Sequence, residues 1–346
     1  MSVLFAHHQA YALHEPGGDH PERPERLQAV ADGVRLAQVG DALVEFSPRA
    51  ATRAELGRVH NADYLARVEW RSLRGEALDP DTMVGPASFE AAKRAAGAGL
   101  DAVERLDAGG ASAAFLAVRP PGHHAMYDQA MGFCLVNNIA VTAAALVARG
   151  ERVLIVDWDA HHGNGTQATF YDEANVLFVS MHQYPAYPGT GALDEIGDGA
   201  GRGATINLPF APGTTGDSYR RAFDTVVVPA AERFAASWLL VSAGFDAHRA
   251  DPLTDLGLSS GDFSDLTARA MRLAPPGRRI FFLEGGYDLE GLTASVAATL
   301  AALVGESLRP EPFSRSSLNQ RAASSDAAAV KVCDQAIVVH EEALAG

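Results

Sequence analysis

Short runs of apolar residues recur along the chain in a way that predicts the buried strands of a parallel sheet. Each run is four to six residues long and rich in branched or aromatic side chains, as buried strands are. The runs are Val3–Ala6, Ala113–Val118, Val153–Val156, Val176–Ser180, Leu239–Ser242 and Ile280–Leu283. Stretches with helical spacing lie between them, at Phe89–Leu106, Asn138–Arg149, Ser218–Ala235, Phe263–Leu273 and Leu292–Leu303. Strands that alternate with helices of this length predict one α/β domain, with an open, mostly parallel sheet flanked by helices on both faces.

The chain beyond residue 306 differs in composition from the part before it. No flexible linker interrupts the chain before about Arg309, so we expect one domain over residues 1–306. Pro310–Asp326 is polar and rich in serine, and Ala327–Ala345 predicts a terminal helix. We expect residues 307–346 to form either a packed appendage of the domain or a contact in a homo-oligomer.

Side chains that could take part in catalysis or metal binding directly follow four of the predicted strands. The segments that carry them are Arg119–His124, Asp157–Gly165, Ala243–Asp246 and Glu284–Tyr287. In open α/β sheets, ligands bind outside the carboxyl ends of the strands. The sequence therefore predicts that carboxylates, imidazoles and a phenol meet at one edge of the sheet.

Three of these residues predict a metal site. Asp157, Asp159 and His161 alternate, so in an extended segment their side chains share one face. Alone, this motif suits helix capping or pairing with arginine equally well. Asp246, at another strand end, completes a set of three ligands with Asp159 and His161 and leaves one coordination position open, which is typical of a catalytic zinc. One histidine with two carboxylates also suits Fe²⁺, so the residues alone leave the metal undecided.

His123, His124 and Tyr287 are the candidates for acid–base and oxyanion chemistry. The pKa of histidine suits a general base near neutral pH, although adjacent histidines are also common on surfaces. Two prolines and a glycine fix the path of the loop that carries the pair. Tyr287 follows two glycines, so it either ends a tight turn or lies over a site where its hydroxyl donates to an oxyanion.

The composition excludes several classes of protein. The chain has 346 residues, of which 28 are basic and 43 acidic, and its net charge of −15 argues against nucleic-acid binding. Two cysteines cannot build a disulfide framework, and the apolar fraction of 47% is enough for a large core. The start of the chain is unlike a secretory signal, and the run Ile139–Ala148 is half the ~20 residues that span a bilayer. We therefore expect a cytoplasmic protein that binds neither membranes nor nucleic acid.

An ordered set of segments resembles the histone deacetylase family of the arginase–deacetylase superfamily, and within it the class II branch and its bacterial relatives. The matching segments are His20–Leu27, Arg119–Ala125, Gly132–Cys134, Asp157–Gln167, Ser180–His182, Tyr187–Gly191, Ser242–Pro252 and Glu284–Tyr287. They occur in the family's order across residues 20–290, and the tail beyond Glu306 lies outside the resemblance.

The resemblance implies hydrolysis of an N-acyl amide, foremost the acetylated side chain of lysine. Three residues would bind the zinc ion: Asp159, His161 and Asp246. His124 would act first as general base on water and then as general acid on the departing amine. Tyr287 would polarise the substrate carbonyl.

Further roles are implied for the residues around this centre. His123 would be the electrostatic partner of His124, Asp157 would orient His123, and Asn164, an acid in class I members, would face His124. The resemblance also implies a structural K⁺ ion, held by the main chain of Asp157, Asp159, His161 and Met181 and by the side chains of Asp157 and Ser180.

A narrow channel for an aliphatic acyl-lysine side chain is implied as well. The residues expected to line it are Phe133 and Tyr187, with Gly132 and Gly286 beside them. Leu253 would occupy the position where polyamine-selective relatives carry a carboxylate, and Asp81 would hold the substrate backbone at the rim.

Three other functions are alternatives to the hydrolysis of acetyl-lysine. An acetylpolyamine amidohydrolase, which applies the same chemistry to a smaller cation, is the strongest of them. A non-catalytic acyl-lysine binding protein would not need the phenol for its function, but Tyr287 is present. An arginase-like ureohydrolase with two metal ions needs further carboxylates, where this chain has Asn164 and His248.

Overall fold

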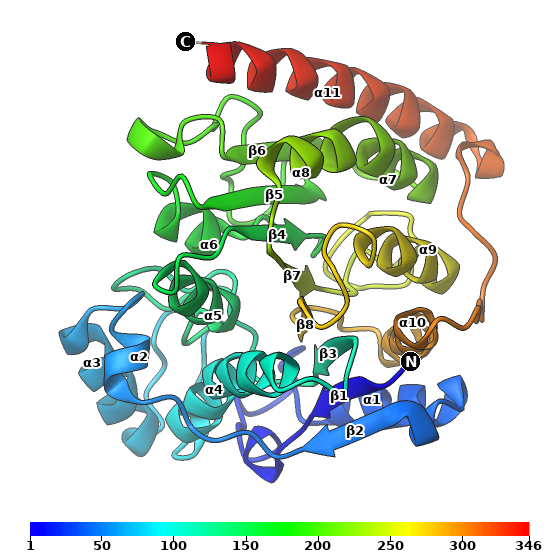
Figure 1. Ribbon diagram of the computed structural model, residues 1–346. Helices are drawn as coiled ribbons and strands as arrows, with labels where there is room; N and C mark the ends of the chain where they lie inside the picture. Colours follow the sequence, from blue (N-terminus) through cyan, green and yellow to red (C-terminus); the bar gives the residue numbers. More distant parts are fainter. Residues whose placement is uncertain (346) are drawn as a thin grey trace.

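In the computed structural model, which describes residues 1–345, the chain folds around one eight-stranded sheet (Figure 1). The strands are β1 (Val3–Ala6), β2 (Leu43–Phe46), β3 (Ala113–Leu116), β4 (Val153–Asp157), β5 (Val176–Gln183), β6 (Thr205–Phe210), β7 (Trp238–Ala243) and β8 (Arg279–Leu283). Their order in the sheet is β2-β1-β3-β8-β7-β4-β5-β6, and each neighbouring pair is parallel. The open, parallel α/β sheet expected from the sequence is confirmed.

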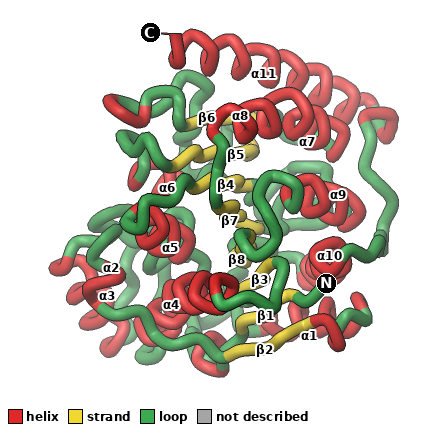
Figure 2. The backbone as a smooth tube through the Cα atoms, viewed as in Figure 1, coloured by secondary structure: helices red, strands yellow, loops and turns green. Residues whose placement is uncertain are grey.

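Helices cover both faces of this sheet (Figures 1 and 2). They are α1 (Glu25–Ala37), α2 (Arg53–Leu56), α3 (Ala62–Arg74), α4 (Ser88–Asp107), α5 (Asn138–Val147), α6 (Asn164–Thr169), α7 (Gly216–Ala222), α8 (Val228–Phe234), α9 (Ser260–Ala270), α10 (Leu289–Val304) and α11 (Gln320–Ala345). Helices α1 and α7–α11 contribute to the core on one face, and α2–α5 to the core on the other. Among residues 1–345, no helix is long and apolar enough to cross a membrane.

Alternate residues of each strand feed the two cores. In β4, Leu154 and Val156 join the core beneath α7–α10, whereas Val153 and Ile155 join the core beneath α4 and α5. Successive side chains of a strand point to opposite faces, and here both faces are covered. This is why the strands appear in the sequence as unbroken apolar runs.

The sequence patterns missed the two edge strands and several helices. β2 has its two middle residues, Val44 and Glu45, exposed, and β6 contains Pro209, so neither is a continuous apolar run. The amphipathic helices α1 and α3 were also missed, as were the short helices α2 and α6. The single helix expected over Ser218–Ala235 is interrupted by a π-helical turn at Phe223–Val227.

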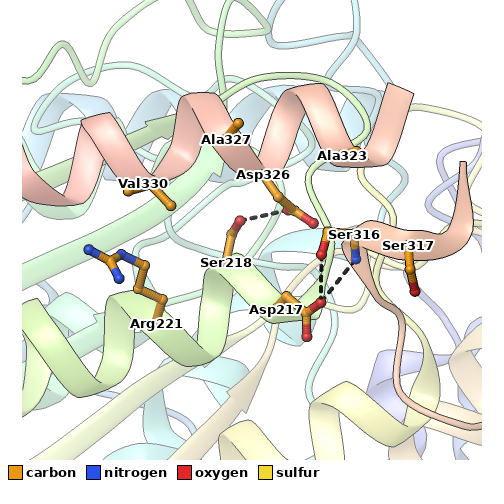
Figure 3. A pocket seen from close by; sticks show the side chains of 9 residues that line it. All are labelled: Asp217, Ser218, Arg221, Ser316, Ser317, Ala323, Asp326, Ala327 and Val330. Atoms are coloured by element: carbon orange, nitrogen blue, oxygen red, sulfur yellow. Dashed lines mark hydrogen bonds between the residues drawn. The ribbon is translucent and has the colours of Figure 1, made fainter. Parts of the chain in front are cut away.

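The C-terminal helix α11 lies along the edge strand β6 and across α7 (Figure 1). It begins seven residues before the start that the sequence indicated. Its Ala329 and Cys333 are buried in the core that contains α7 and α9. The buried Asp326 of α11 accepts hydrogen bonds from the Thr215 N–H at 2.8 Å and the Ser218 hydroxyl at 2.6 Å, next to the α7 N-terminus (Figure 3). The helix is therefore fixed to the sheet domain by both apolar and charged contacts.

Candidate active site

The candidate site lies at the carboxyl ends of the four central strands. These strands, β3, β8, β7 and β4, are consecutive neighbours in the sheet. The loops that follow them carry His123 and His124, Tyr287, Asp246, and Asp159 with His161. Parallel strands end at the same edge, so the sheet topology brings together segments that lie more than 160 residues apart in the chain.

Asp159, His161 and Asp246 form a group that could hold a metal ion, called the metal-ligand group below. One donor atom from each lies within 4.8 Å of the other two. His161 Nδ1 lies 2.9 Å from Asp246 Oδ2 and 3.3 Å from Asp159 Oδ1. Ligands that are ~2.1 Å from a tetrahedral zinc ion are about 3.4 Å apart, so these spacings fit such an ion. The donor set, two carboxylates and one imidazole in a buried position, suits a divalent metal.

The chain reaches this arrangement by bending after β4 and not by continuing as a strand. The expectation that Asp157, Asp159 and His161 share one face of an extended segment is therefore wrong. The strand ends at Asp157, whose Oδ1 accepts the Asp159 N–H at 3.1 Å, and Asp159 Oδ1 accepts the His161 N–H at 2.9 Å. Asp246 Oδ1 accepts the Ala160 N–H at 2.8 Å and so ties the β7 loop to the bend.

His123 and His124 lie beside this group and have different partners. Their ring centroids are 4.0 Å apart. His123 Nδ1 lies 2.9 Å from the buried Asp157 carboxylate, and His124 Nδ1 lies 2.7 Å from the Asn164 amide oxygen. An amide oxygen only accepts, so His124 Nδ1 carries the hydrogen. The lone pair of a neutral His124 therefore resides on Nε2, which is free to take up a proton.

The surroundings favour opposite charge states for the two imidazoles. Burial lowers the pKa of His124 well below its usual value, and the positive charges of His123 and His161 lower it further. Burial alone would also lower the pKa of His123, but the Asp157 and Asp159 carboxylates outweigh it and raise that pKa to about 10. Thus His124 is the neutral imidazole of the pair, and His123 is its charged neighbour.

Tyr287 is held on three sides. Its ring meets the Phe133 ring edge to face at 5.7 Å, and the Arg26 guanidinium lies 5.1 Å from its centroid. Its backbone N–H donates to Asp251 Oδ2 at 2.7 Å. Burial raises the pKa of Tyr287; the Arg26 charge opposes this, but the Asp246 and other nearby carboxylates add to it. The phenol is consequently a neutral O–H donor at pH 7.

Of the expected channel walls, Tyr187 lies against His124, and Phe133 lies against Tyr287. The Tyr187 ring is 5.3 Å from the His124 ring, edge to face, and it is 40% exposed, which places it at the opening. Gly132 has a φ of +54°, and a Cβ there would lie 2.5 Å from His124 Cδ2. Only glycine lets the chain pass this close to the imidazole.

Asp81 and Leu253 occupy the outer part of the site. The Thr82 hydroxyl donates to Asp81 Oδ1 at 3.1 Å and accepts the Phe133 N–H at 3.2 Å, so Asp81 adjoins the Phe133 wall. Burial raises the pKa of Tyr187, and the negative charge of Asp81 raises it further. Leu253 is 43% exposed on the loop after β7.

The residues implied for K⁺ binding are also adjacent. Asp157 and Ser180 are direct partners in the register between β4 and β5. The Ser180 hydroxyl lies 2.9 Å from His182 Nδ1, and the Met181 carbonyl accepts a hydrogen bond from the Tyr219 hydroxyl at 3.3 Å.

A buried ionic cluster behind Tyr287 was missed at the sequence level. Arg26 donates to the Gly286 carbonyl at 2.8 Å and to the Glu284 carbonyl at 2.6 Å, and so fixes the turn that carries the phenol. Arg26 and Arg119 both pair with Glu22, and all three side chains are fully buried. Arg26 and Arg119 both lie in segments that carry the resemblance, which was the available signal, but no sequence pattern showed which groups they contact.

Glu284 and Asp251 were missed for the same reason. Glu284 Oε2 accepts the N–H groups of Gly122 at 2.6 Å and His123 at 3.3 Å, which fixes the loop carrying the histidine pair. Burial raises the pKa of Glu284 to about 7. Asp251 holds the Tyr287 and Leu253 backbones together. These residues orient the site through main-chain contacts, which a sequence does not display.

Comparisons with known proteins agree with this geometry. The histone deacetylase domain model matches residues 20–303. A probable deacetylase of Archaeoglobus fulgidus is 38% identical over 312 residues, covering 88% of this chain and 87% of the relative. A histone deacetylase-like amidohydrolase of Pseudomonas aeruginosa is 40% identical over 276 residues, covering 78% of this chain and 73% of the relative.

The solved structures give the same result. The crystal structure of the HDA15 HD domain superposes with a TM-score of 0.85 and 35% sequence identity, covering 100% of both chains. An open α/β sheet with a buried group of three residues that could hold a metal ion at its carboxyl edge fits a hydrolase of the arginase–deacetylase fold. The chain belongs to the histone deacetylase family.

Proposed function

We propose that the protein hydrolyses N-acyl amides in a metal-dependent reaction and that its substrates are acetylated lysine side chains. The observation that carries this proposal is the placement of a neutral, buried histidine beside a metal-ligand group. His124 faces Asn164 on one side and lies 6.1 Å, ring to ring, from the ligand His161 on the other. That arrangement supports activation of water near an electrophilic centre.

Asp159, His161 and Asp246 would hold the metal, which we propose to be Zn²⁺, with Fe²⁺ as the other ion that this donor set accommodates. When bound, it supplies Lewis-acid polarisation and lowers the pKa of water. His124 takes the proton of the attacking water at Nε2 and returns it to the departing amine. The Tyr287 hydroxyl donates to the oxyanion of the tetrahedral intermediate.

Two supporting groups complete the proposal. His123, paired with Asp157, places a positive charge next to His124 and keeps the proton affinity of that base low. A structural K⁺ ion is supported by the juxtaposition of Asp157 and Ser180 across β4 and β5, both fully buried. Oxygen ligands of this kind suit a hard cation.

The rim favours a peptide substrate. Leu253 offers no charge to the second ammonium group of a polyamine, and desolvating that ammonium against leucine costs free energy. Asp81, next to the Phe133 wall, can instead accept peptide N–H groups. One observation favours the acetylpolyamine alternative: the net charge of −15 attracts polycations. Long-range attraction raises the encounter rate for both substrates and does not select between their shapes.

We propose the catalytic domain over residues 1–306 and a packed appendage over residues 307–346. Glu311 supports the packing of the appendage on the domain, because its Oε2 accepts the Ser260 N–H at 2.9 Å and lies 2.7 Å from His248 Nε2. His248 is on the same loop as Asp246. The appendage thus contacts the loop that carries a metal ligand.

The test is kcat/KM on a matched panel of acetyl-lysine peptides, longer acyl-lysine peptides and acetylpolyamines. We expect acetyl-lysine peptides to be the best substrates. The Tyr287→Phe variant, assayed in parallel, identifies the hydrolysis as that of this site. A kcat/KM for acetylspermidine or acetylputrescine about tenfold above the best peptide would refute the substrate assignment. Absence of hydrolysis across the panel, with metal bound, would refute the reaction.

A further inference from the structure

A cavity whose lining combines apolar side chains with arginines lies at the edge of the sheet opposite the candidate active site. It has a volume of about 250 Å³ and is lined by residues that precede β4 and β6, together with the ends of α8 and α11. The amino ends of β4, β5 and β6 form this edge, whereas the metal-ligand group lies at the carboxyl ends. A ligand in this cavity is therefore separate from the substrate of the hydrolase.

Three arginines line the cavity, and none of them forms an ion pair with a side chain among residues 1–345. They are Arg152, Arg202 and Arg233. Arg152 donates to the Phe234 carbonyl at 2.9 Å and stacks 4.2 Å from its ring, so only part of its guanidinium is engaged. All three are exposed residues on the cavity lining, and in a chain with a net charge of −15 these guanidiniums without a carboxylate partner among residues 1–345 are a local excess of positive charge.

His340 provides the second, independent observation. It lies in the wall of the cavity on α11 and is only 7% exposed. Its Nδ1 is buried and has no hydrogen-bond partner among the described residues. Buried polar groups are normally paired, and an exception points to a ligand or a functional role. Burial and the Arg233 charge lower the pKa of His340, so the imidazole is neutral at pH 7 and offers one N–H.

The hollow between α7 and α11 shows the contrast (Figure 3). There, several polar side chains pair with one another: Ser218 donates to Asp326 at 2.6 Å, and the Ser316 hydroxyl donates to Asp217 at 3.0 Å. The arginine-lined cavity has no such internal pairing among its charged groups within residues 1–345. Its arginines therefore have no charge partner within the described chain.

We propose that this cavity binds a small organic phosphomonoester. A phosphomonoester carries a charge of about −1.5 to −2 at neutral pH and has three acceptor oxygens. Guanidinium groups bind phosphate in a bidentate manner, and three of them with one imidazole N–H match its oxygens. The apolar wall, formed by Leu177, Phe234 and Leu344, suits the organic part of the ligand. At about 30 Å³ per water molecule, the cavity has the room of about eight waters, which exceeds what a lone phosphate needs.

The proposal is tested by titrating the full chain with phenyl phosphate in a calorimeter. Inorganic phosphate and benzoate are the comparison probes, because each lacks one half of the recognised chemistry. We expect phenyl phosphate to bind more tightly than either and to bind more weakly as salt is raised. The Arg202→Ala/Arg233→Ala variant should weaken binding by about tenfold or more. Arg58→Ala, which removes an exposed arginine elsewhere on the surface, should leave the affinity unchanged.

His340→Gln is the second variant, since it removes the imidazole but keeps a polar side chain on α11. We expect weaker phenyl phosphate binding and an unchanged melting temperature for the ligand-free protein. The proposal is overturned if phenyl phosphate does not bind in the millimolar range, or if benzoate binds as tightly. It is also overturned if the arginine variant binds phenyl phosphate as tightly as the wild type.

Discussion

Asp251 makes a sharp test of how the site is held together. It is buried, and its two carboxylate oxygens accept backbone N–H groups from two different loops. Oδ2 accepts the Tyr287 N–H at 2.7 Å, and Oδ1 accepts the Leu253 N–H at 3.0 Å. In Asp251→Asn, one oxygen becomes an NH₂ group, so an N–H donor meets a second donor. Either the turn that carries Tyr287 or the loop that carries Leu253 then loses its hydrogen bond to residue 251.

The magnitude follows from the lost contact. A hydrogen bond to a charged acceptor contributes about 1.5–3 kcal/mol to stability. With an unfolding entropy of about 2.1 cal/mol/K per residue, that loss lowers the Tm of a chain of this length by about 2–4 °C. The substitution lowers kcat by displacing Tyr287. The decrease therefore cannot exceed the one caused by removing the Tyr287 hydroxyl itself, which is about 10²–10³ in kcat. We expect a decrease of about ten- to hundredfold, because displacing a catalytic group by about 1 Å has that effect.

The assay is kcat on an acetyl-lysine peptide for the wild type, Asp251→Asn, Tyr287→Phe and the double variant, with metal content measured for each. If Asp251 acts through the phenol, Asp251→Asn lowers kcat in the wild type and has no further effect in the Tyr287→Phe background. Asp255→Asn, an exposed carboxylate on the same loop, is the control. An equal decrease of kcat in both backgrounds, or an unchanged kcat in the single variant, would show that the reasoning is wrong.

Three further outcomes are expected. Tyr287→Phe should keep its metal and its fold while kcat falls by about 10²–10³; a lower Tm with near-normal kcat would instead assign the phenol a structural role. Glu22→Gln leaves the buried Arg26 and Arg119 charges uncompensated, so thermal unfolding should show a loss of about 3–5 kcal/mol, whereas an unchanged Tm would refute the coupling. Leu253→Glu should raise kcat/KM for acetylspermidine relative to an acetyl-lysine peptide, and an unchanged ratio would remove Leu253 from the specificity argument.

The central strands of the sheet were predictable from the sequence, whereas the edge strands and several helices were not. Central strands are covered on both faces, so β4 and β7 appear as unbroken apolar runs that local pattern detects. An edge strand such as β2 is half exposed and only four residues long, and its identity depends on pairing with β1. Helix α3 is amphipathic but carries charged residues throughout, so its periodicity is less visible than that of α4.

The candidate site was predictable as far as side chains follow strand ends. The structure brings together Asp159, His161 and Asp246, which the sequence grouped through the expected sheet. It does so through a bend after Asp157 that alternation along the chain did not indicate. Arg26 acts through backbone carbonyls 258 and 260 residues away, and such contacts exist only in three dimensions.

Metal reconstitution tests the central claim most directly. The metal-free protein, prepared with a chelator, is titrated with Zn²⁺ while hydrolysis of an acetyl-lysine peptide and bound metal are followed together. The account predicts that activity is absent at the start and rises to a plateau at one equivalent per chain. Asp246→Ala should lose metal and activity together, since the ligand set needs its deprotonated carboxylate. Full activity in the chelator-treated, metal-free wild type would contradict the account.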